Sequence, residues 1–240
     1  MYYVYFIIMC WSEKSSLTTF LIGTIVSLFL IIRNKAYDRL FGIFFVWIIF
    51  MQFLEYLMWR DINCTGNLNN IASQIAWFQN LSQPLIGGIL LIVYVYVGQT
   101  LKDKNKNSPI PLVLFMILLI AYAWLFLWWI FDKKPYKTTF CTQPCKTNCG
   151  GHHLQWPWTE NYGSLIWIGY FIMFAVIIVA SLRNKAGLIL SAYLLISCVI
   201  ASIFLPFSKA LGSWWCVFAI GGPVVKLLIP TSIFDQPLLY

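Results

Sequence analysis

The feature that most constrains this chain is a series of apolar segments that recur along its whole length between polar loops. A helix rises about 1.5 Å per residue, so roughly 20 apolar residues cross the hydrocarbon core of a bilayer. Only 10% of the residues are charged, whereas a soluble domain carries about 25%. So few charges cannot cover a water-facing surface, and the apolar side chains are expected to face lipid. The sequence therefore predicts an all-α, polytopic integral membrane protein.

Seven segments are apolar enough to be membrane-spanning helices, and together they form one transmembrane domain that covers residues 1–240. The first and the last of these segments are short. A chain of this kind is expected in a plasma membrane, a secretory-pathway membrane or a virion membrane, with the lipid bilayer as a partner. The predicted spans are residues 17–32, 40–59, 72–97, 110–131, 164–182, 187–205 and 214–229.

Basic residues in the loops predict how the spans are oriented, because Lys and Arg accumulate in short loops on the inner side of a membrane. With the N-terminus outside and the C-terminus inside, the inner loops hold eight Lys and Arg in 23 residues, and the outer segments hold seven in 68. The net charge of +8 forms no stripe, so no nucleic-acid partner is expected. The inner loops are then 33–39, 98–109 and 183–186, and the long outer loop is 132–163.

Six of the seven cysteines lie on or near the predicted outer side. An even number of cysteines in an oxidising compartment predicts disulfides, but six cysteines allow fifteen pairings and the sequence does not choose among them. Asn63 begins an Asn-Cys-Thr sequon in an outer loop, which makes it a glycosylation candidate, although many sequons are never used. The disulfide candidates are Cys10, Cys64, Cys141, Cys145, Cys149 and Cys216.

The outer loop 132–163 also holds the only two histidines of the chain, His152 and His153. Cysteine and histidine together can bind zinc, but the Cys-x3-Cys-x3-Cys spacing in this loop does not follow a zinc-finger pattern. Disulfides are the favoured interpretation, and neither a metal nor a cofactor is expected. Because histidine changes its charge near neutral pH, the two histidines are candidates for a gate or a proton site.

Glu55 is the only acidic residue within a predicted span. An ionisable side chain in hydrocarbon costs about 3 kcal/mol on insertion scales, so it is a candidate functional residue. It lies one turn below Trp59, about 6 Å under the outer boundary. Gln52 lies three residues earlier and shares a helix face with it.

The third predicted span is unusually polar in its outer half. Gln79 and Gln83 are four residues apart on one helix face, and Pro84 cannot donate to the carbonyl group of Asn80. The second and third spans run antiparallel, so their polar groups could line one outward-facing cavity. Alternatively, the amides form interhelical hydrogen bonds whose only role is to hold the helices together. The candidate ion- or ligand-binding residues are Glu55, Gln52, Gln79, Asn80 and Gln83.

The last predicted span holds two glycines and a proline at 221–223. This combination predicts a loosened helix, which could form a flexible wall of a transport path. A kink with a packing role is the alternative. Lys226 lies low in the same span, and no acidic residue stands four positions before it, which argues against a retinal-binding lysine.

Three short motifs stand in order along the chain. They are Cys10-Trp11-Ser12 followed by Ser16, Gln52-x-x-Glu55-x-x-x-Trp59, and Trp215-Cys216. Together they resemble the motifs of an uncharacterised family of small seven-span integral membrane proteins from bacteria, algae and large DNA viruses. The resemblance implies a seven-span fold and singles out Cys10, Gln52 and Glu55. It implies no activity, because the family has none assigned. The Ile-, Phe-, Tyr- and Asn-rich composition fits a viral source.

Two main functional hypotheses follow, and neither is catalytic, because the spans hold no histidine and no catalytic motif is present. In the first, the protein is a channel or transporter for a proton, a small cation or a small polar solute, with Glu55 as the charged site. In the second, it is a structural or receptor-like protein, for example of a virion membrane, whose disulfide-braced outer loop contacts a partner or a second copy of the chain. A membrane-embedded enzyme that holds zinc on His152 and His153 is a third hypothesis.

Overall fold

The computed structural model describes part of the chain, and some of the sites predicted above lie outside the described residues. The predicted sites outside are Cys10, Cys145, Cys149, Cys216, His152 and His153. The described residues are 12–35, 37–93, 109–133, 141–144, 154–156, 165–181 and 219–228, with positions 188, 189, 192, 193, 196, 197 and 199.

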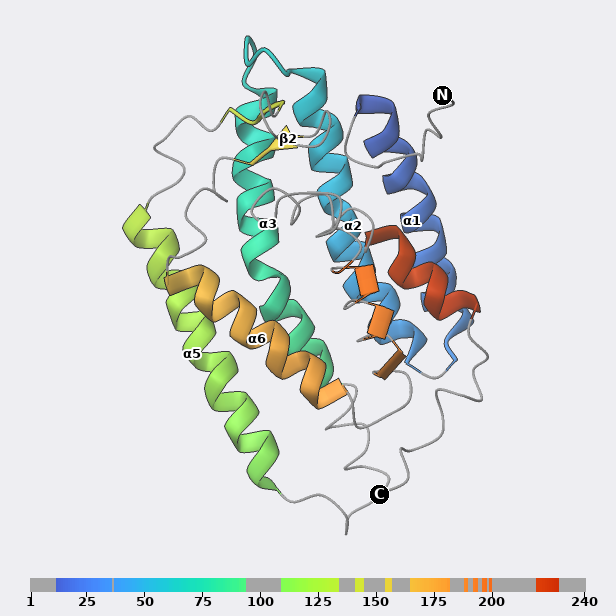
Figure 1. The fold of residues 1–240 in the computed structure, drawn as a ribbon, viewed down its shortest axis with the longest axis vertical. Helices are drawn as coiled ribbons and strands as arrows, with labels where there is room; N and C mark the ends of the chain where they lie inside the picture. The colour runs from blue at the N-terminus through green and yellow to red at the C-terminus, as the bar shows by residue number, and fades with distance from the viewer. Residues whose placement is uncertain are drawn as a thin grey trace.

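The described residues are mostly helical, as predicted, and helices that follow one another run antiparallel (Figure 1). Two short strands, β1 (Gln143–Pro144) and β2 (Leu154–Gln155), pair antiparallel between α5 and α6. The helices are α1 (Glu13–Arg33), α2 (Asp38–Arg60), α3 (Leu68–Leu91), α5 (Pro109–Lys133) and α6 (Leu165–Ser181), with a further helix over Ala219–Leu228.

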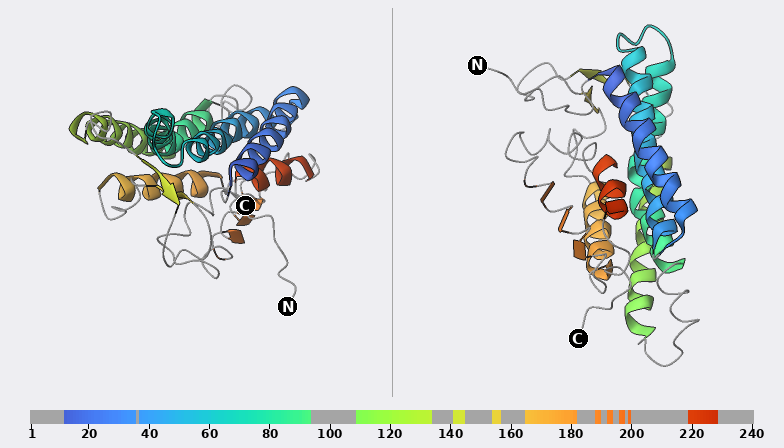
Figure 2. Two further views of the ribbon diagram at one scale, coloured as in Figure 1. Left: turned by 90° about the horizontal axis from the view of Figure 1, so that it is seen from above. Right: turned by 90° about the vertical axis from the view of Figure 1, so that its right-hand side faces the viewer.

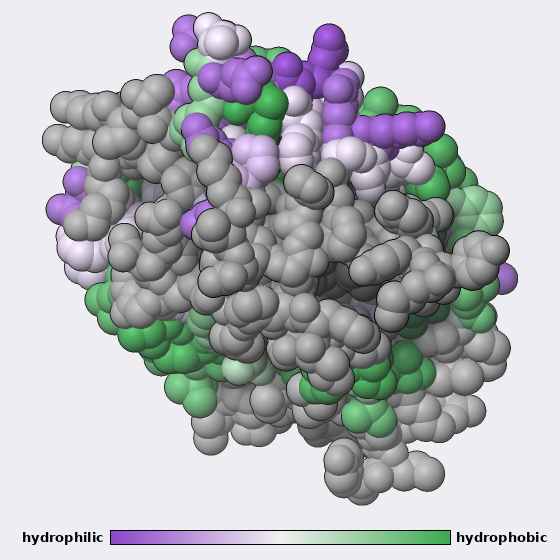
Figure 3. Space-filling view, turned by 45° about the horizontal axis from the view of Figure 1, so that its top comes forward, coloured by the Kyte–Doolittle hydropathy of each residue, from purple (hydrophilic) through white to green (hydrophobic). Residues whose placement is uncertain are grey.

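Three of these helices are long and apolar enough to cross a membrane, namely α1, α2 and the Val113–Asp132 part of α5. The segments Leu165–Ile178 and Ala219–Leu228 are apolar but shorter. Large apolar side chains stay exposed on the flanks; Ile32 of α1 is 80% exposed and Trp124 of α5 is 70% exposed. Hydrophilic residues gather at the end of the bundle that carries the α2–α3 turn, and hydrophobic residues lie on the flanks below them (Figure 3). Such a surface is compatible with insertion into a bilayer.

The helices form two layers (Figure 2, left). In one layer α5, α3, α2 and α1 lie side by side, each packed on the next, and α6 packs against α3 and α5 from the second layer. In α3, 14 of 24 residues are buried, against 5 of 21 in α1. The long helix that is too polar to count as an apolar span is therefore the one most enclosed by its neighbours.

Two helices begin four residues earlier than their predicted spans, because polar residues join their first turns. At α1, the Ser12 hydroxyl accepts a hydrogen bond from the backbone N–H of Ser15 at 3.1 Å, which caps the helix. At α3, the first turn includes Asn69, a polar residue that is fully buried. Hydropathy places the start of a span at its first apolar run, so it misses both turns.

The loosened helix expected at 221–223 is not found, because the described helix runs unbroken from Ala219 to Leu228. A Cβ atom on Gly222 would overlap the ring of Phe45, and one on Gly221 would overlap the ring of Tyr193. The two glycines therefore serve close packing against α2 and against the residue at position 193.

Small residues bring α1 and α2 close together. The buried face of α1 carries mostly small side chains that recur every three or four residues, and Gly42 of α2 packs against it. Small residues at such spacing let two helix backbones approach closely in a membrane. The buried face of α1 consists of Ser16, Thr19, Gly23, Ser27 and Leu30.

Gly42→Ala tests this packing. A Cβ atom at position 42 would lie 2.6 Å from a side-chain carbon of Ile31 and 2.8 Å from the carbonyl oxygen of Ser27. That oxygen belongs to the backbone, so the helices must move apart, and we expect a loss of about 1–3 kcal/mol. Thermal unfolding of the full chain in detergent measures the loss.

Gly66→Ala is the matched control, because a Cβ atom there meets nothing closer than 3.4 Å. Its melting temperature should equal that of the wild type. If Gly42→Ala also melts like the wild type, α1 and α2 are not packed as described.

Candidate functional site

All five predicted binding residues lie in the interior of the described bundle. Gln52 and Glu55 are on α2, and each is 1% exposed. Gln79, Asn80 and Gln83 are on α3, and each is at most 1% exposed. The expected outward-facing cavity is therefore closed at all five side chains in this conformation.

Glu55 is enclosed by groups from two distant parts of the chain. Gln52 lies one turn earlier on α2, and Trp156 follows β2; the side chains of both lie beside the carboxyl group of Glu55 and interact with it. Trp156 is itself only 4% exposed. The amide and the indole are neutral groups, so Glu55 is held in a compact, mostly uncharged setting. Sequence reasoning missed Trp156, which stands 101 positions from Glu55.

Gln79 and Gln83 belong to a separate chain of hydrogen bonds. The Gln79 side-chain amide donates to the backbone oxygen of Trp47 at 2.6 Å, and the Gln83 amide donates to Gln79 Oε1 at 3.4 Å. The hydroxyl of Tyr170, on α6, donates to Gln83 Oε1 at 3.0 Å. Asn80 follows Gln79 in the sequence and is also buried. Within the described residues its Oδ1 accepts no hydrogen bond. These hydrogen bonds join α2, α3 and α6. This is the alternative role considered in the sequence analysis, in which the amides hold neighbouring helices together.

The structure does not bring Gln79 next to Glu55, because α3 begins at Leu68 and Gln79 lies further from the α2–α3 turn than Glu55 does. Gln79 bonds to Trp47, which lies eight residues before Glu55, or about 12 Å along the helix axis. The single predicted cluster is therefore two sites. Glu55 and Gln52 lie near one end of the bundle, and Gln79 and Gln83 lie deeper.

A buried polar network that was not predicted from the sequence attaches the α5–α6 loop to the start of α3. The Asn69 side chain pairs with the backbone of Thr142 in both directions, donating to its carbonyl oxygen and accepting from its N–H, each at 2.9 Å. The Ser73 hydroxyl lies 2.7 Å from the Thr142 hydroxyl and donates to Asn69 Oδ1 at 3.0 Å. Asn69, Ser73 and Thr142 are all 0% exposed. Asn69 also donates to the Met58 carbonyl oxygen at 3.2 Å, so one amide ties α2, α3 and the loop together.

A disulfide reinforces the same attachment. It joins Cys64, in the α2–α3 turn, to Cys141, immediately before Thr142, with 6.1 Å between the two Cα atoms. This bond fixes one pairing among the six candidate cysteines. The neighbouring Asn63 of the sequon is exposed, and its glycosylation stays a prediction.

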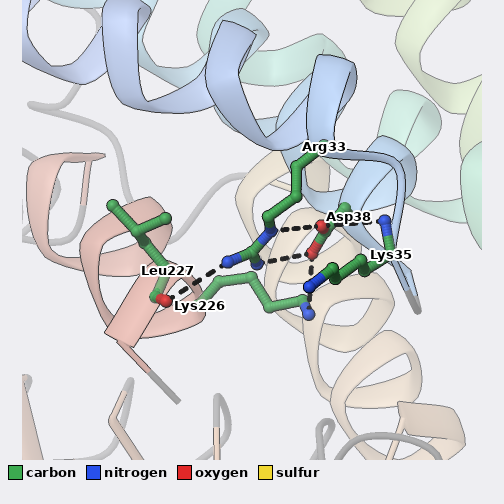
Figure 4. Close-up of polar contacts among 5 residues, drawn as sticks. All are labelled: Arg33, Lys35, Asp38, Lys226 and Leu227. Carbon is green, nitrogen blue, oxygen red and sulfur yellow. Dashed lines mark hydrogen bonds and ion pairs between the residues drawn. The ribbon is translucent and has the colours of Figure 1, made fainter. Parts of the chain in front are cut away.

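At the opposite end of α2, a buried ion-pair cluster joins three helices (Figure 4). Asp38 accepts two hydrogen bonds from the Arg33 guanidinium group, at 2.7 and 3.0 Å. The Lys226 ammonium group lies 2.9 Å from Asp38, and both of these side chains are 0% exposed. The backbone N–H of Lys35 also donates to Asp38 at 3.0 Å. A lysine low in a span needs an acidic partner, and that was the sequence signal that could have identified Asp38.

The α2–α3 turn is closed by Asp61. Its Oδ1 accepts from the backbone N–H of Gly66 at 3.0 Å, and its Oδ2 accepts from the backbone N–H of Asn69 at 3.1 Å. These two bonds hold the pKa of Asp61 below its ordinary value of 3.8. Since Asn69 also binds Thr142, Asp61 supports the residue that attaches the α5–α6 loop.

Comparisons of the chain with protein-family models, with curated proteins and with solved structures found no match. The resemblance to the seven-span family therefore stays a prediction that rests on its three motifs. Two residues of the first motif have a structural role, because Ser12 caps α1 and Ser16 is buried in its first turn. In the second motif, Gln52 and Glu55 meet at one site.

The lowered pKa of Asp61 predicts an acid-dependent turn. The folded pKa lies below the unfolded one, so the two bonds stabilise the turn above the ordinary value of 3.8 and are lost as the pH falls through the lowered value. We expect the amide resonances of Gly66 and Asn69 to titrate together with a midpoint below 3.8. Nuclear magnetic resonance of the full chain in detergent follows both signals.

Two variants check the assignment of this titration. Asp61→Asn should abolish it, whereas Glu13→Gln, which removes an exposed acid at the same end of the bundle, should leave it intact. A shared midpoint at or above 3.8 in the wild type would show that Asp61 does not close the turn.

Substitutions in the ion-pair cluster should differ in a predictable order. Removing one partner of a buried ion pair costs about 3–5 kcal/mol, because the other charge stays buried. Asp38→Asn leaves both Arg33 and Lys226 without their shared acid, whereas Lys226→Met leaves Asp38 paired with Arg33. We expect Asp38→Asn to lower the melting temperature further than Lys226→Met, and the double variant to recover part of that loss.

Thermal unfolding of the full chain measures these effects, and Lys35→Met, at an exposed side chain, is the control that should match the wild type. If Asp38→Asn melts like Lys35→Met, the cluster does not hold the three helices together.

Proposed function

We propose that the chain is a seven-span integral membrane protein, with its N-terminus outside, that passes a proton, a small cation or a small polar solute at Glu55. One observation carries the proposal. Glu55 is 1% exposed within a helix that is long and apolar enough to span a membrane. Its polar neighbours, Gln52 and Trp156, come from the same helix and from the predicted outer loop.

The cost of burying an acid supports a binding role. An ionisable group inside a span costs about 3 kcal/mol on insertion scales, and a bound proton or cation offsets that cost. Carboxylate and amide oxygens are suitable ligands for a hard cation, and Glu55 and Gln52 supply both kinds. A small polar solute would use the same groups as hydrogen-bonding partners.

Further polar groups lie deeper in the bundle, on α3, about 12 Å along the helix axis from Glu55. The hydrogen-bonded pair Gln79 and Gln83 lies deeper, and the Ser82 hydroxyl accepts from the indole N–H of Trp47 at 3.2 Å. Such groups offer successive hydrogen-bonding positions to a proton or a solute that moves through the bundle. Because these side chains are buried, this conformation corresponds to the closed state of the proposed protein.

The outer loop supports a second candidate function. Its described residues are fixed to the helices by the Cys64–Cys141 disulfide and by Thr142, while Gln143 and Gln155 stay exposed on the paired strands. A braced loop of this kind could serve as the contact surface of a structural or receptor-like membrane protein, for example in a virion membrane. A partner protein or a second copy of the chain would then bind there.

Glu55→Gln tests the first function. The substitution keeps the size and polarity of the side chain but removes its charge and its exchangeable proton, so we expect flux to fall roughly tenfold or more. Flux of protons, of Na⁺ or K⁺ and of glycerol is measured with the full chain in proteoliposomes. Glu13→Gln, at an acid that is about half exposed, should match the wild type.

If wild-type vesicles leak no faster than empty vesicles for every probe, the transport function fails. The loop-contact function would then be the better explanation of the braced outer loop.

A further inference from the structure

We propose that the described part of the outer loop is a gate that controls access to Glu55. The role of this gate rests on the proposed transport function. The gate consists of residues 141–144 and 154–156, which we call the outer cap. Its two strands pair Gln143 with Gln155 and Pro144 with Leu154. The cap lies at the end of the bundle that carries the α2–α3 turn (Figure 1).

The cap has one side turned toward Glu55 and one side turned away from the bundle. The Trp156 indole lies beside the Glu55 carboxyl group, and Leu154 and Trp156 are 6% and 4% exposed. Gln143 and Gln155 are exposed on the other side. Glu55 lies five residues before the end of α2, about 8 Å along the axis. Movement of Trp156 would therefore uncover the carboxyl group by a short route.

Hydrogen bonds hold the cap shut. Asn69 makes two bonds with the Thr142 backbone, and Ser73 lies within hydrogen-bonding distance of the Thr142 hydroxyl. Water can take the place of each partner once the contact opens, so such a contact is easier to release than an equally buried apolar one. The three buried polar side chains Asn69, Ser73 and Thr142 therefore form a contact that can open and close again.

The disulfide keeps the cap attached when it opens. Cys141, at the start of the cap, is bonded to Cys64 in the α2–α3 turn, whereas Trp156, at the end of the cap, contacts Glu55 without a covalent bond. Release of Asn69 from Thr142 would let the Trp156 end move while the Cys141 end stays in place. A tether of this kind keeps the effective concentration of the cap high, so the gate recloses readily.

The test measures how fast Glu55 reacts with a water-soluble carbodiimide and glycine ethyl ester. The full chain is held in lipid nanodiscs, and the modified peptide is quantified by mass spectrometry. Asn69→Ala removes both bonds to the Thr142 backbone, so we expect labelling of Glu55 to become roughly tenfold faster or more, as for a site reached by local opening. Asn70→Ala, the same substitution at the adjacent residue, should label at the wild-type rate.

A second pair of measurements protects the test against a folding defect. Thr142→Val removes the contact with the Ser73 hydroxyl but keeps the backbone bonds to Asn69, so we expect a smaller acceleration. Reduction of the Cys64–Cys141 disulfide in Asn69→Ala should accelerate labelling further, because the cap loses its tether. Equal labelling rates for the wild type, Asn69→Ala and Thr142→Val, with melting temperatures unchanged, would overturn the gate.

The gate and the transport function fail in different ways. Faster labelling of Asn69→Ala in a protein that passes no probe would support the gate and reject transport. Flux that depends on Glu55, together with labelling that does not depend on Asn69, would support transport and reject the gate.

Discussion

Inside a helical bundle that excludes water, each polar side chain must find its partner on a neighbouring helix or loop. This constraint acts most strongly on α3, which is polar and central. Trp47 of α2 accepts a hydrogen bond from Gln79, and Tyr170 of α6 donates one to Gln83. Tyr122 of α5 donates one to a backbone carbonyl group of α3 at 2.8 Å. Each neighbour of α3 in the two layers thus provides a hydrogen bond, which explains why the most polar of the long helices occupies the centre of the bundle.

The helical pattern and the five buried candidate residues of α2 and α3 could be predicted, because both depend on local sequence. Apolar runs locate α1, α2 and α5, and hydropathy alone indicates that the acid Glu55 and the amide Gln83 are buried. The partners of these residues could not be predicted. Asn69 and Thr142 are 73 positions apart, and nothing in either local sequence indicates the other.

Register between helices was the second limit on prediction. Which residues of two antiparallel helices lie at the same depth can be predicted only when the length of the connecting turn is known. Because α3 begins earlier than predicted, its residues lie further from the turn than expected. The predicted neighbours Glu55 and Gln79 therefore belong to two sites. The ion pair of Asp38 with Lys226 was missed for a related reason, because Asp38 begins α2 at a position that hydropathy assigns to a loop.

The two ends of the bundle are held by different kinds of interaction, and this difference bears on which end can open. At the end with the α1–α2 turn, Asp38 is shared by Arg33 and Lys226, and separating buried charges leaves each of them without its partner at a high cost. At the end with the α2–α3 turn, Asn69 and Thr142 form neutral hydrogen bonds, for which water is an adequate substitute. A reversible change is therefore easier at the end with the α2–α3 turn, where the Cys64–Cys141 disulfide keeps the loop attached and which is also the end nearer to Glu55.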